Sequence, residues 1–172
     1  MPKTLDPSGN DTEPAILFGE NGKVIASSPY PLSWQQLKAR FATSRYRATL
    51  AERFEAWVYA CSSLVKIEQI WIGGSFCSDK IEPRDIDTVL FYRHITPMPD
   101  PVMRSAFFAQ HADVLSYQGA LEHFQIDSAL LSLSLDPLRL IHWSAYWTML
   151  LSGMSDGQRR PFYTINVNSL IK

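Results

Sequence analysis

The spacing of hydrophobic residues along the first part of the chain predicts two helices. After Ser44, apolar residues recur at steps of three and four to about residue 63, which places them on one face of a helix. The members of this apolar stripe are Leu50, Phe54, Trp57, Val58 and Cys61. A shorter helix, ending near Phe41, is predicted before it because Ser33 and Gln36 have the spacing of a capping box.

Beyond residue 66 the pattern changes to short runs rich in β-branched and aromatic residues. Strands are predicted over 67–73 (IEQIWIG), 86–92 (IDTVLFY) and 124–133 (FQIDSALLSL), and a final strand over 161–167 (PFYTINV). Asp-Pro pairs at 100–101 and 136–137 supply the N-cap and first residue of two further helices, which end near residues 117 and 151. Strands interspersed with helices predict an α/β or α+β fold built on a sheet.

The predicted helix from 136 to 151 carries apolar residues around much of its circumference. This pattern predicts either that the helix is deeply buried or that it contacts another chain. Between residues 33 and 53 the sequence has five basic residues and one acid, Glu52. This excess of positive charge is compatible with an RNA-contacting surface, although a solvated helical surface is more common. The basic residues are Lys38, Arg40, Arg45, Arg47 and Arg53.

The N-terminal residues differ in character from the rest. Residues 1 to about 14 are polar and rich in turn formers, and the following AILF, GENG and KVIASS predict a small hairpin or extended arm. We therefore divide the chain into an N-terminal tail or arm over 1–30 and one domain over 31–172. A turn is also expected at 155–157, before the last strand.

Composition narrows the classes of protein. Of the 172 residues, 46% are hydrophobic and 19% charged, a globular balance, and the net charge of −1 gives no sign of general nucleic-acid or membrane affinity. The N-terminus has no apolar segment typical of a signal peptide, and no apolar run approaches the ~18 residues that span a bilayer. We expect a soluble cytoplasmic protein that binds no membrane, with Cys61 and Cys77 as reduced thiols.

Candidate chemistry lies in the stretch IWIGGSFCSDKIEPRDIDTVLFY, residues 70–92. Asp85 and Asp87 alternate along a predicted strand and so project from one side, and Asp127 lies near the start of another strand. If the two strands are neighbours, three carboxylates converge at one sheet end. Clustered carboxylates repel, so either one takes up a proton or a cation neutralises them, and oxygen ligands without Cys or His favour Mg²⁺ or Mn²⁺. The alternative is a solvated turn in which Asp85 caps backbone amides.

Gly73, Gly74 and Ser75 precede these acids and offer backbone N–H groups and a hydroxyl without bulky side chains. Such a turn suits a phosphate, particularly if a helix begins just after it, although a simple tight turn is the alternative. A phosphate-binding turn beside a carboxylate-held cation indicates phosphoryl or nucleotidyl transfer. Lys80 in the following loop and Arg160 before the last strand could contact phosphates, against the alternative that both are only solvated.

The string Gly74-Ser75, nine residues, Asp85-Ile86-Asp87 and a later strand aspartate, Asp127, resembles the nucleotidyltransferase superfamily of DNA polymerase beta. More narrowly, WIGGSF…DK…P.DID resembles the small bacterial and phage-associated proteins of the minimal nucleotidyltransferase type, and the ending HWSAYWTMLLSGMSDGQRRPFYTINV is similar to theirs. The resemblance covers roughly residues 31 to 168 and implies a mixed β-sheet flanked by helices.

The resemblance also implies roles for individual residues. Asp85 and Asp87 would ligate two metal ions that bridge the triphosphate of an NTP substrate. Asp127 would share one metal and help to deprotonate the acceptor hydroxyl. Gly74 and Ser75 would hold the β- and γ-phosphates, with Gly73, Lys80 and Arg160 as further nucleotide-binding candidates.

Three functions remain open at this point. The first is transfer of an NMP to a hydroxyl on protein or RNA, in a toxin–antitoxin or phage-defence setting, with a partner protein or a second copy completing the site. The second is a non-catalytic, antitoxin-like interaction module with the same fold, which the apolar helix over 136–151 favours. The third is a phosphohydrolase or nuclease that uses the same three carboxylates with water as the nucleophile.

Overall fold

The computed structural model describes residues 29–153, 160–167 and 170. The N-terminal tail and hairpin predicted within residues 1–28 and the turn predicted at 155–157 lie outside these residues.

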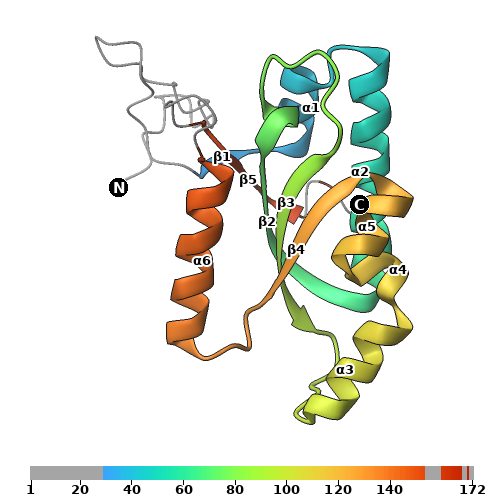
Figure 1. The fold of residues 1–172 in the computed structure, drawn as a ribbon, viewed down its shortest axis with the longest axis vertical. Helices are drawn as coiled ribbons and strands as arrows, with labels where there is room; N and C mark the ends of the chain where they lie inside the picture. The colour runs from blue at the N-terminus through green and yellow to red at the C-terminus, as the bar shows by residue number, and fades with distance from the viewer. Residues whose placement is uncertain (1–28, 154–159, 168–169, 171–172) are drawn as a thin grey trace, which may run out of the picture.

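Five strands of the described chain form one mixed sheet, and four of them lie where the sequence predicted strands (Figure 1). Their spatial order is β1-β5-β2-β3-β4, with β1–β5 and β3–β4 parallel and β2 antiparallel to both β5 and β3. The strands span Tyr30–Leu32 (β1), Val65–Gly73 (β2), Ile86–His94 (β3), Ile126–Ser132 (β4) and Tyr163–Ile165 (β5). The edge strand β1 was not predicted, because a segment of three residues with a proline at its centre has no recognisable period.

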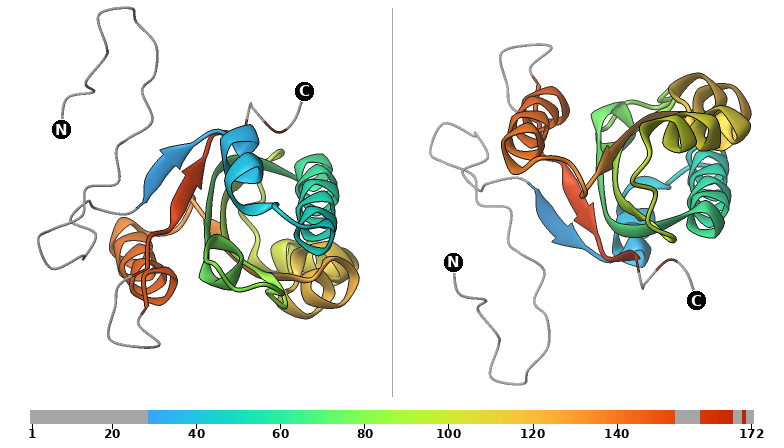
Figure 2. Two further views of the ribbon diagram at one scale, coloured as in Figure 1. Left: turned by 90° about the horizontal axis from the view of Figure 1, so that it is seen from above. Right: turned by 90° about the horizontal axis from the view of Figure 1, so that it is seen from below.

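Helices cover both faces of the sheet, which makes the fold α+β. They span Trp34–Phe41 (α1), Arg45–Leu64 (α2), Pro101–Gln110 (α3), Ala112–Leu115 (α4), Tyr117–Phe124 (α5) and Pro137–Leu151 (α6). Seen along the sheet, α6 lies on one face, and α1, α2, α4 and α5 lie on the other (Figure 2). The four-residue 3₁₀ turn η1, Gly74–Cys77, follows β2 directly.

The predicted helix from 100 to about 117 is wrong in its extent. The first segment, α3, ends at Gln110, and His111 leaves the helical conformation while its N–H still donates to the Phe107 carbonyl. Ser116 then caps α5 by accepting from the Gly119 N–H at 2.9 Å. The strand predicted from 124 begins at Ile126, because α5 extends over those residues and ends with a left-handed residue at position 125.

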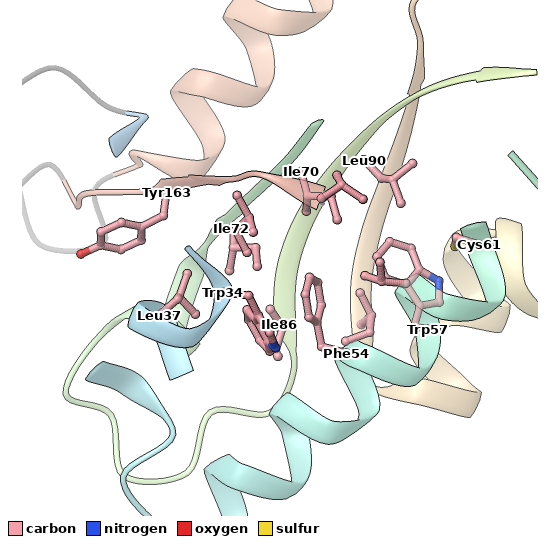
Figure 3. Close-up of a cluster of buried hydrophobic side chains, with 14 of the residues drawn as sticks. Trp34, Leu37, Phe54, Trp57, Cys61, Ile70, Ile72, Ile86, Leu90 and Tyr163 are labelled. Carbon is pink, nitrogen blue, oxygen red and sulfur yellow. The ribbon is translucent and has the colours of Figure 1, made fainter. Parts of the chain in front are cut away.

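The main hydrophobic core lies between the sheet and α1, α2 and α5 (Figure 3). The stripe predicted on α2 is fully buried there, and Trp57 also donates its indole N–H to the Val114 carbonyl at 3.0 Å. A smaller second cluster covers the opposite face of the sheet, under α6. The side chains that build it are Trp71, Val89, Phe91, Leu131, Leu151 and Phe162.

The helix α6 is not deeply buried, so that alternative of the sequence analysis is wrong. Of its residues only Leu151 is buried, at 6% exposure. Large apolar side chains line its outward face, from Leu138 (76% exposed) to Met149 (61%). Of the helices that the structure describes, none is long and apolar enough to cross a membrane.

Candidate functional site

The three candidate acids lie at one end of the sheet. The parallel strands β3 and β4 are neighbours, and Asp87 pairs in register with Asp127, so their Cα atoms are about 5 Å apart. Both side chains share the face of Val89 and Ala129, the face that α6 covers. Asp85 lies two residues before Asp87 and is buried, at 8% exposure. The two strands are thus neighbours, which is the condition that the sequence analysis set for the three acids to converge.

The glycine turn and Asp87 form one structural unit. Gly73 pairs with Asp87 across β2 and β3, and Gly74 has a positive φ of 67°. A Cβ atom on Gly74 would lie 1.6 Å from Asp87 Oδ2, so no other residue fits without moving the carboxylate. The Ser75 backbone N–H donates to the Asp87 carboxylate. This amide, predicted to bind phosphate, therefore already has an acceptor within the chain.

Asp85 has a partner that the sequence analysis missed. Arg84 Nε donates to Asp85 Oδ2 at 3.1 Å, although the Arg84 side chain is 77% exposed and such a pair contributes little stability. Gln125, in the left-handed conformation after α5, donates its side-chain amide to the Arg84 carbonyl at 3.3 Å, and the Ile86 N–H donates to the Gln125 carbonyl. These bonds tie the segment before β3 to the segment before β4.

The carboxylates perturb one another. Burial, followed by the charges of Asp85 and Asp127, raises the pKa of Asp87 to about 6, against the backbone amides of Ser75 and of Asp87 itself, which lower it. Burial, and then the charge of Asp85, also raises the pKa of Asp127, while Arg84 opposes this shift. Near neutral pH a fraction of Asp87 therefore holds a proton, which is one of the two responses expected of clustered acids.

The donor set fits a hard divalent cation in chemistry but does not form a finished site. Carboxylate oxygens without His or Cys are the ligands that Mg²⁺ and Mn²⁺ prefer. Across residues 29–153 and 160–167, however, no group of three or more His, Cys, Asp or Glu side chains is arranged to hold a metal ion. The Asp85 carboxylate accepts a hydrogen bond from Arg84, and the Asp87 carboxylate accepts one from the Ser75 backbone N–H. Both side chains would have to reorient to bind a metal ion together.

Arg47 anchors the loop that follows the glycine turn. Its guanidinium donates to the carbonyls of Phe41, Phe76, Ser78 and Lys80, with 2.5 Å from Nη1 to Lys80 O, and lies 5.1 Å from the Phe76 ring centroid. The residue is only 4% exposed. For Arg47, the interpretation as part of a solvated or RNA-contacting surface is therefore wrong. Arg47 lies one turn before Leu50 and Ala51 on the buried stripe of α2, and this position was the available signal.

The two candidate cations differ in position. Lys80 is exposed in the loop, with its carbonyl bound by Arg47. Arg160 is half-buried, and its backbone N–H donates to the Ser152 carbonyl, just past the end of α6, at 3.3 Å. It lies two residues before Phe162, whose Cβ is 3.2 Å from the position of a Cβ on Gly73. The Arg160 backbone is thus at the same end of the sheet as the acids.

Comparisons with known proteins give a family but no function. A family model described as "Family of unknown function (DUF6932)" matches residues 15–165, most of the chain. No curated protein and no solved structure matches the chain.

Proposed function

The chain belongs to this family of unknown function, DUF6932, and from its site we propose a metal-dependent nucleotidyltransferase that moves an NMP from an NTP to a hydroxyl on protein or RNA. One observation carries the proposal. Asp87 and Asp127 share one face at one end of the sheet, Asp87 lies directly beside Gly74, and Asp85 is close enough for its charge to raise the pKa of Asp87. Acids that repel one another beside a glycine–serine turn suit a cation-bound triphosphate better than a purely structural role.

In this proposal each residue has a separate task. Asp85 and Asp87 would hold Mg²⁺ or Mn²⁺, which supplies charge neutralisation at the triphosphate. Asp127, whose raised pKa makes it the more basic kind of carboxylate, would accept the proton of the acceptor hydroxyl. The backbone at Gly74 and the hydroxyl of Ser75 would orient the terminal phosphates, and Arg160 would approach them from the start of β5.

The acceptor is proposed to be a macromolecule. The described residues form one sheet domain without a second lobe to enclose an acceptor. A protein or RNA acceptor brings its own contact surface, and a partner protein or second copy could complete the site. A toxin–antitoxin or phage-defence role fits these features, and it rests on the sequence resemblance.

The test compares Asp87→Asn with the wild type, using NTPs labelled at the α-phosphate and Mg²⁺. The substitution removes one ligand charge without changing volume, so transfer of label to a macromolecule should fall by about 100-fold or more. Asp113→Asn, an exposed acid on α4, is the matched control and should transfer label at the wild-type rate. Equal Mg²⁺–NTP binding by Asp87→Asn and the wild type contradicts the assignment.

The exposed apolar face of α6 favours a second candidate, a non-catalytic interaction module. This candidate requires a stable complex with another protein and no Mg²⁺–NTP binding at the acidic end of the sheet. The labelling experiment separates the candidates. Label on a macromolecule supports transfer, release of free nucleotide indicates a phosphohydrolase, and the absence of both supports the interaction module.

A further inference from the structure

A cavity of about 890 Å³ lies at the opposite end of the sheet from the acids. It opens where the parallel strands β3 and β4 end, beside the first turns of α3. Along β3, His94 in the cavity wall lies seven positions beyond Asp87, a distance of about 23 Å. Crevices at the carboxyl ends of parallel strands are the usual ligand sites of open sheets.

The charge in the cavity wall is positive. Arg93 and Arg104 line it, and none of its lining residues is an aspartate or glutamate. Arg93 is paired with Glu68 at 3.3 Å. Arg104 has no ion pair with any acid that the structure describes, and its Nη1 donates to the carbonyls of Met98 and Pro99 at 2.5 and 2.7 Å. These two bonds hold the guanidinium in place before a ligand arrives, which reduces the entropy cost of binding.

The rest of the wall combines apolar and aromatic side chains with three serines. Phe108 lies edge-on to Tyr92, with ring centroids 5.9 Å apart, and His94 lies edge-on to the same two rings. The Tyr92 hydroxyl is hydrogen-bonded to the Ser132 side chain. Burial and the charge of Arg104 both lower the pKa of His94, so His94 stays neutral and Arg104 supplies the local charge. A wall of this kind suits a flat apolar group attached to an anion.

We propose that this cavity binds a small organic anion, a carboxylate or a phosphate monoester carrying a flat apolar group, with Arg104 pairing to the anion. The flat group would lie against Phe108 and Met98. This site goes beyond the proposed transferase activity, because no residue of the acidic end of the sheet takes part in it.

The test uses ligand-observed saturation-transfer NMR on the full chain at pH 7.5, with EDTA present so that no cation bridges a ligand to the acids. The probes are phenyl phosphate and benzoate, which distinguish the two anion types, and neutral phenol. We expect one or both anions to bind at least about tenfold more tightly than phenol, since a charge-assisted arginine contact contributes that much. Equal binding of phenol and both anions would overturn the proposal.

Two variants locate the binding. Arg104→Gln removes the charge but keeps one donor for the Met98 and Pro99 carbonyls, and Ser105→Phe fills the mouth of the cavity from an exposed position of α3. Both should weaken binding of the anion by about tenfold or more. Arg53→Gln, on the exposed side of α2, should bind like the wild type and controls for net charge. Cooperative thermal unfolding shows that the variants are folded. If Arg104→Gln and Ser105→Phe are both folded and bind the anion as tightly as Arg53→Gln, the anion does not bind in this cavity.

Discussion

At the scale of single residues, Asp87 is the point where the requirements of folding and of the proposed chemistry oppose each other. Its carboxylate is partly buried, lies beside two other acids and accepts a hydrogen bond from the Ser75 backbone N–H. Desolvation and repulsion make the charged form costly, and the backbone amides of Ser75 and of Asp87 itself offset only part of this cost. Groups held against their preferred ionisation are common where a protein binds a cation or substrate, and less common where acids only cap turns.

The raised pKa of Asp87 predicts a dependence of stability on pH. Its pKa is about 6 in the folded chain and near 3.9 in an unfolded one. Between about pH 4 and 6 the folded chain binds more protons, so the free energy of unfolding falls as the pH rises and levels off above 6. Asp87→Asn removes the part of this fall that Asp87 contributes and should be more stable than the wild type by about 1–2 kcal/mol at pH 7.5, after allowance for solvent screening, with no difference near pH 4.

Urea denaturation from pH 4 to 8 in EDTA measures this difference. Asp113→Asn removes an exposed acid and should track the wild type throughout. Parallel stability curves for Asp87→Asn and the wild type would show that Asp87 has an ordinary pKa and that the acids at 85 and 127 do not reach it.

At the scale of elements, Arg47 connects α2 to the loop that begins with the glycine turn. Arg47→Met keeps the buried stem of the side chain but leaves the carbonyls of Phe76, Ser78 and Lys80 without this donor. We expect a loss of about 3 kcal/mol in the free energy of unfolding, because buried acceptors without partners are costly. The loop also carries Ser75, so Mg²⁺–NTP binding should weaken together with stability.

Chemical denaturation of Arg47→Met and Arg53→Met checks the role of Arg47. The two residues lie on the same helix, but Arg53 is exposed, and its substitution should change stability by no more than about 0.5 kcal/mol. A similar small effect at position 47 would mean that the loop holds its shape without the guanidinium.

Helix starts could be predicted from the sequence because their signals are local. Ser33 accepts from the Gln36 N–H at 3.2 Å, and Asp136 accepts from the Leu138 N–H at 3.0 Å, as their spacing indicated. The pairing of β1 with β5 could not be predicted, since it joins residues more than 130 positions apart through three-residue strands. For the site, alternation predicted that Asp85 and Asp87 share one side, but only the sheet register brings Asp127 beside Asp87.

The buried cation shows a different limit of sequence analysis. Arg47 occupies a core-facing position of α2, yet the sequence analysis grouped it with exposed residues because it is charged. Its acceptors are backbone carbonyls, which every residue has, so no acidic partner in the sequence pointed to its burial. Periodicity was the stronger signal at this position, and residue type was the weaker one.

At the scale of the whole molecule, the sheet separates three surfaces. The acids and the glycine turn occupy one end, and the cavity lined by Arg104 occupies the other. Helix α6 runs along one face of the sheet (Figure 1). The other face carries the large core and most of the helices. Most of the burial therefore lies on the α2 side, which leaves the α6 side with a small cluster and an apolar outer surface.

The outer surface of α6 predicts which substitutions the chain tolerates. Leu138→Gln with Met149→Gln replaces side chains that are 76% and 61% exposed, and should change the free energy of unfolding by no more than about 0.5 kcal/mol. Leu151→Ala, on the inner side of the same helix, should cost about 2–4 kcal/mol, because it opens a cavity against Gly73 and Phe162. Chemical denaturation of the three proteins measures both changes.

A large loss from the outer pair contradicts this prediction and means that another segment or a second copy covers the helix. Repeating the measurement at two protein concentrations separates those cases, since only an interface between copies makes stability depend on concentration. An outer pair without effect at either concentration leaves the face free for a different protein, which the interaction-module alternative requires.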